Sequence, residues 1–110
     1  MNHGLPEETL ALVRGVLARF PVVASAVLFG SRAKGVHRAG SDIDLALIGR
    51  SLDWRLPGQV DDALDDLLLP YRFSLIVLDD HTDPSVAAHI ARVGVPFYRR
   101  DDASGSTERG

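Results

Sequence analysis

Cysteine is absent from the 110 residues of this chain, which excludes disulfide bonds, thiolate nucleophiles and cysteine-based zinc sites. No apolar run approaches the ~20 residues that a membrane-spanning helix needs. The first residues, MNHGLPEETL, lack the basic start and apolar run of a signal peptide, so we expect a cytoplasmic protein without a membrane. Basic residues are in deficit, with 12 Lys and Arg against 15 Asp and Glu, so we expect no direct binding to nucleic acid.

Helical and strand patterns alternate along the chain, which is long enough for a single domain over residues 1–100. The last ten residues, 101–110, have the composition of a disordered tail. We expect helices over 6–20, 59–69 and 84–93, strands over 24–29, 43–48 and 73–78, a short edge strand over 95–98, and a loop over 49–58. This order predicts an α/β (α+β) fold, with a small mixed sheet and helices packed mainly on one face.

The stretch from Gly30 to Leu47, GSRAKGVHRAGSDIDLAL, carries the chemistry that the sequence reveals. Asp42 and Asp44 stand two residues apart at the start of a strand, so their side chains share one face. Two neighbouring carboxylates repel each other unless a cation neutralises them. Mg²⁺ suits such a pair, because it binds one or two carboxylates while phosphate oxygens complete its coordination shell.

The turn before this pair has the features of an anion site. Gly30 and Ser31 follow the strand over 24–29, where glycine lets a ligand approach the backbone and serine can cap a short helix. Arg32 and Lys34 make the following connection locally basic in an acidic protein. An anion-binding turn beside a metal-binding pair is what a metal–triphosphate complex requires.

The pattern GS, ten residues, DxD resembles the nucleotidyltransferase superfamily that includes the DNA polymerase β palm. The chain is similar to the minimal nucleotidyltransferases (MNT family) in three features: the residues GSRAKG…SDIDLAL, the short length and the ending IARVGVPFYRR. The resemblance covers about residues 6 to 99 and implies the nucleotidyltransferase fold. It also implies that Gly30 and Ser31 hold the triphosphate of ATP, that Asp42 and Asp44 hold Mg²⁺, and that Arg32 and Lys34 add phosphate contacts.

Members of this family serve as antitoxins that pair with a helical HEPN-domain toxin. The resemblance therefore implies a protein adenylyltransferase that moves AMP from ATP to a hydroxyl, a tyrosine in first place, of a HEPN partner in a hetero-oligomer. One departure stands out: the family places a third carboxylate on the third strand, and Ser74 occupies that position here. Two alternatives stay open, a weakened MNT subunit that neutralises its partner by binding alone and a nucleotidyltransferase acting on a small molecule.

Two surface features are not assigned by the sequence. Trp54 can be either a cap on the core or an exposed contact for a partner. Four acids are expected on the solvated face of the second helix, namely Asp61, Asp62, Asp65 and Asp66.

Overall fold

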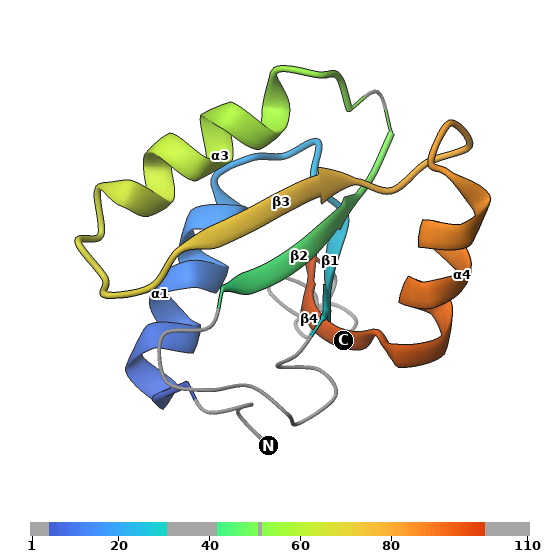
Figure 1. Cartoon of the computed structure of the whole chain (residues 1–110). Helices are drawn as coiled ribbons and strands as arrows, with labels where there is room; N and C mark the ends of the chain where they lie inside the picture. The colour runs from blue at the N-terminus through green and yellow to red at the C-terminus, as the bar shows by residue number, and fades with distance from the viewer. Residues whose placement is uncertain (1–4, 31–41, 51, 101–110) are drawn as a thin grey trace, which may run out of the picture.

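The computed structural model of the protein describes residues 5–30, 42–50 and 52–100. Three helices and four strands lie in these ranges (Figure 1). In chain order they are α1 (Glu7–Ala18), β1 (Ser25–Phe29), β2 (Ile43–Ile48), α3 (Leu56–Asp65), β3 (Phe73–Val77), α4 (Pro84–Val93) and β4 (Val95–Arg99). The expected tail over 101–110 lies outside the described residues.

The four strands form one mixed sheet in the order β3-β2-β1-β4. β1 is antiparallel to both of its neighbours, β2 and β4, whereas β2 and β3 are parallel. A parallel pair needs a crossover, and α3 provides it between β2 and β3. The mixed sheet predicted from the sequence is confirmed.

The main core lies between the sheet and helices α1 and α3, which Figure 1 shows on the same side of the sheet. Alternate strand residues such as Leu28, Leu45 and Leu47 are fully buried in this layer, as strand periodicity requires. Helix α4 lies on the opposite side in Figure 1, where it buries Ile90 and where Gly94 packs on Val27. Two of the three described helices thus share one face, in line with the expected arrangement.

The second expected helix is displaced toward the N-terminus. It begins at Leu56 and ends at Asp65, rather than running over 59–69, so the loop expected over 49–58 is shorter. Pro57 is a helix-start residue because it has no N–H to leave unpaired, and it opens the helix rather than belonging to the loop. Val60 and Leu64 face the core, whereas Leu68 is 89% exposed and has a φ of 57° in the turn after the helix.

The surface features left open by the sequence now have positions. Trp54 is 86% exposed, with the Arg55 guanidinium 5.9 Å from its ring centre, so it does not cap the core. Asp62, Asp65 and Asp66 lie exposed, whereas Asp61 is half-buried. Burial, followed by the charges of Asp65 and Asp62, raises the pKa of Asp61. Within the described ranges, no helix is long and apolar enough to cross a membrane.

Helix α4 has a side-chain N-cap. Asp83 precedes it, and its carboxylate accepts hydrogen bonds from the backbone N–H of Ser85 (2.8 Å) and from the Ser85 hydroxyl (2.7 Å). Gly94 ends the helix, in an extended conformation with a φ of −67° rather than a left-handed one. A Cβ at this position would collide with the Ile90 carbonyl oxygen and with Val27, so close packing is what requires glycine there.

Candidate functional site

Gly30 and Asp44 meet where β1 ends and β2 begins. The antiparallel register pairs Phe29 with Asp44, which places the next residue, Gly30, against the aspartate side chain. Gly30 has a φ of +79°, a conformation that residues with a Cβ rarely adopt. A Cβ added there would also collide with the Asp44 carboxylate. The geometry of this turn therefore needs glycine for two separate reasons.

Asp44 lies on the sheet face opposite to the main core. Its strand neighbours Ile43 and Leu45 are fully buried, while Asp44 is half-buried and Asp42 is exposed just before the strand. Burial raises the pKa of the Asp44 carboxyl, and the nearby charge of Asp42 raises it further. A cation between these two side chains would remove both penalties.

Ser74 is a neighbour of this pair. The parallel register places it directly opposite Asp44, and the polar Ser74 side chain lowers the pKa of the Asp44 carboxyl, against the two effects that raise it. The sequence had identified Ser74 only as a missing carboxylate. Its contact with Asp44 could not be read from the sequence, because it depends on the register of two strands about 30 residues apart.

The described part of the site suits a magnesium ion that is shared with phosphate oxygens. No cluster of three or more His, Cys, Asp or Glu side chains occurs within residues 5–30, 42–50 and 52–100, so a closed all-protein metal cage is absent there. Two carboxylates that repel each other, one of them packed against the Gly30 turn, fit Mg²⁺ with substrate phosphates. Of the predicted phosphate contacts, Ser31, Arg32 and Lys34 lie outside the described residues.

A small mixed sheet of this topology, carrying paired aspartates beside a glycine turn, defines a domain of the nucleotidyltransferase type. The chain belongs to the polymerase beta nucleotidyltransferase family, whose family model matches residues 13–103. The fold class inferred from the sequence is thus confirmed.

One curated relative is the probable protein adenylyltransferase MntA of Haemophilus influenzae, which is 33% identical over 73 residues. The matched stretch covers 66% of this chain and 64% of that relative, a little under two thirds of its length.

Several solved structures share the fold. A chain of a toxin–antitoxin crystal structure with AMP-PNP matches with a TM-score of 0.66 and 22% identity, over 90% of this chain and 77% of that one. A chain of the toxin–antitoxin MntA-HepT structure matches with a TM-score of 0.65 and 17% identity, over 89% and 76%. A chain from the complex of tri-AMPylated Shewanella oneidensis HEPN toxin with MNT antitoxin matches with a TM-score of 0.64 and 19% identity, over 88% and 76%.

Proposed function

We propose that this chain is an MNT-type antitoxin, a nucleotidyltransferase that moves AMP from ATP to a hydroxyl of a partner HEPN toxin, with a tyrosine as the expected acceptor. The observation that carries the proposal is the Gly30 turn packed against the Asp44 carboxylate, next to Asp42. The name of the Haemophilus influenzae relative and the AMPylated toxin in the Shewanella oneidensis complex support the same activity.

Each residue of the site has a distinct part in this reaction. Asp42 and Asp44 hold Mg²⁺, and Gly30 with Ser31 gives the triphosphate access to backbone N–H groups. Arg32 and Lys34 offset phosphate charge. Bound Mg²⁺ supplies positive charge at the phosphates during transfer. The acceptor hydroxyl loses its proton to water as its oxygen bonds to the α-phosphorus, and the bond to the departing pyrophosphate breaks.

A second candidate rests on Ser74, which cannot act as a base at neutral pH in the way a third carboxylate can. In that case the chain binds its partner, and the nucleotide site has lost turnover. The contact between Ser74 and Asp44 motivates this candidate, because it fills the position next to the metal pair with a neutral group.

Labelled ATP, Mg²⁺ and the proposed HEPN-domain partner distinguish the two candidates. Transfer predicts label on the partner, whereas binding alone predicts a hetero-oligomer on gel filtration with no label. The double variant Asp42→Asn, Asp44→Asn is the control, and it should abolish labelling while leaving the complex intact. Toxin neutralisation in cells that survives this double change would overturn the adenylyltransferase proposal.

A further inference from the structure

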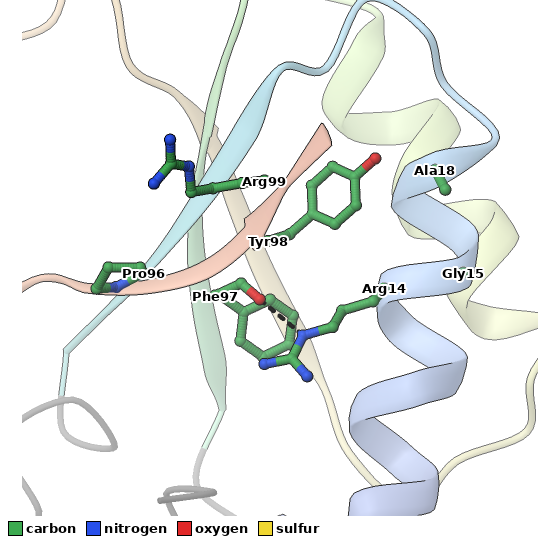
Figure 2. A pocket seen from close by; sticks show the side chains of 7 residues that line it. All are labelled: Arg14, Gly15, Ala18, Pro96, Phe97, Tyr98 and Arg99. Carbon is green, nitrogen blue, oxygen red and sulfur yellow. Dashed lines mark hydrogen bonds between the residues drawn. The ribbon is translucent and has the colours of Figure 1, made fainter. Parts of the chain in front are cut away.

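A groove of about 510 Å³ lies between helix α1 and the edge strand β4, on the side of the sheet away from Asp44 (Figure 2). Its volume is in the range of ordinary ligand sites. Arg14, Gly15 and Ala18 line it from α1, and Pro96, Phe97 and Tyr98 line it from β4. None of these residues takes part in the candidate nucleotide site.

Gly15 is the first sign that the groove has a use. Glycine inside a helix costs roughly 0.5–1 kcal/mol relative to alanine. Nothing lies within 4 Å of where a Cβ would stand, so local packing does not require glycine here. The effect of Gly15 is instead to widen the groove, together with the small side chain of Ala18.

The edge of β4 is closed to an added strand. Pro96 has no N–H to offer a neighbouring strand. The Phe97 carbonyl oxygen already accepts a hydrogen bond from Nε of Arg14 at 2.8 Å, as Figure 2 shows. These are devices that prevent strands from pairing with a free sheet edge. The groove is therefore suited to side chains rather than to an extra strand.

The Arg14 guanidinium is oriented by its contacts with Phe97 and is available to bind an anionic group. Besides its bond to Phe97, its guanidinium lies over the Phe97 ring at 5.3 Å from the ring centre. In the described ranges the salt bridge formed is between Arg55 and Asp53, and Arg14 has no acidic partner there. An oriented guanidinium that lacks a carboxylate can bind one with little further loss of side-chain freedom.

Tyr98 adds a polar group that lacks a partner. Its side chain is 4% exposed, and its hydroxyl has no hydrogen-bond partner among the described residues. Figure 2 shows the ring reaching from β4 toward α1 near Ala18. An unpaired buried hydroxyl costs about 1–3 kcal/mol, which an acceptor entering the groove would offset.

Building on the proposed function, we propose that this groove docks the partner protein, through a segment that places an acidic side chain on Arg14 and apolar side chains against Ala18 and Phe97. Arg14 and Gly15 are exposed, so the groove opens to solvent as a protein segment needs. The register pairs Val95 with Leu28, next to Phe29, which pairs with Asp44. Along the sheet, Val95 is therefore two strand spacings, or ~10 Å, from β2, and the Asp44 side chain lies on the other face of that sheet.

The test measures the affinity of this chain for the proposed HEPN-domain partner, by calorimetry. All variants carry Asp42→Asn and Asp44→Asn, so that binding is recorded without transfer. Gly15→Leu fills the groove with a better helix former and should weaken binding at least about tenfold without loss of stability. Gly58→Leu is the matched control, since Gly58 is also helical with open space at its Cβ, and it should bind like its parent.

A second variant separates docking from packing. Tyr98→Phe removes the unpaired hydroxyl, so thermal stability should stay level or rise, while affinity for the partner falls about fivefold. Unchanged affinity in both Gly15→Leu and Tyr98→Phe overturns the docking site while leaving AMP transfer untouched. If Gly15→Leu abolishes self-association of this chain instead, the occupant is a second copy and the proposal is overturned. If the parent chain forms no complex with the HEPN-domain protein, both the proposed partner and the docking site are overturned.

Discussion

At the scale of single residues, Gly30 is a position where both the backbone conformation and the packing require glycine. Gly30→Ala should lower the free energy of unfolding by about 1–3 kcal/mol, because a Cβ is disfavoured at this φ and would displace the Asp44 carboxylate. Urea denaturation measures the loss. Gly58→Ala, in a helix with open space, should instead raise stability by about 0.5–1 kcal/mol. Equal effects at the two glycines would contradict the strained turn.

The ionised Asp44 carboxylate lowers the stability of the folded protein. Because the pKa of its carboxyl is raised in the folded state, the ionised form costs stability above the ordinary value of about 4, and protonation at lower pH relieves that cost. In EDTA at pH 7, Asp44→Asn should therefore be the more stable protein, by less than about 1 kcal/mol for a side chain partly open to water. Thermal melts should show this gain vanishing below pH 4, and a gain that persists there would refute its electrostatic origin.

Ser74→Asp tests the position beside Asp44. A third carboxylate there should lower the melting temperature in EDTA, because it adds a like charge, and Mg²⁺ with ATP should restore it. We expect partner labelling to rise by about tenfold or more, as for an added general base. Ser25→Asp is the control, because Ser25 shares the sheet face but pairs with Ile48 at the other end of β2. The same response to Mg²⁺ in both variants would contradict a metal site at Asp44.

At the scale of elements, the Asp83 cap gives α4 a defined pH dependence. Its pKa is lowered by the hydrogen bonds from Ser85, so the cap contributes stability above about pH 4 and loses it as the pH falls through the lowered pKa. Asp83→Ala should lower the melting temperature at pH 7 and approach the wild type at pH 2–3. Differential scanning calorimetry at both pH values checks this, and a difference independent of pH would rule out the carboxylate as the cap.

Strongly patterned elements could be predicted from the sequence, and their boundaries less well. The strand over 43–48 agrees with β2 because Asp42 and Gly49 bound an apolar run. Helix α3 is displaced because Pro57 is equally common in loops and in first helical turns, and only the packing of Leu56 and Val60 distinguishes them. Leu68 has the spacing of a core residue, four positions after Leu64, but the helix ends at Asp65, before reaching it.

The part of the candidate site that lies within the GS…DxD motif could be predicted from the sequence. Gly30 lies against Asp44, and Asp42 acts on the Asp44 carboxyl, because β1 and β2 are antiparallel neighbours with Phe29 paired to Asp44. The contact between Ser74 and Asp44 depends instead on cross-strand register. The groove beside Gly15 depends on how a helix packs against a strand. Neither leaves a periodic pattern in the sequence.

At the scale of the whole molecule, Arg100 ties the last described residue to the first helix. Its guanidinium donates to the carbonyl oxygens of Phe20 (2.9 Å), Val23 (3.2 Å) and Ala18 (3.3 Å). Arg100→Ala should lower the free energy of unfolding by about 1–3 kcal/mol, because helix-end carbonyls lose their donors. Chemical denaturation measures this. The exposed neighbour Arg99 provides the control, with Arg99→Ala expected within about 0.5 kcal/mol of wild type.

The position of β4 also has a consequence for how the protein folds during its synthesis. β1 lies inside the sheet, yet one of its two partners is the last strand of the described chain, about 70 residues later. While the chain is being synthesised, β1 has an open edge until residues 95–99 have left the ribosome. A nascent or truncated chain that stops before this point exposes an apolar strand that can aggregate. The sheet is therefore complete only after residues 95–99 have been synthesised.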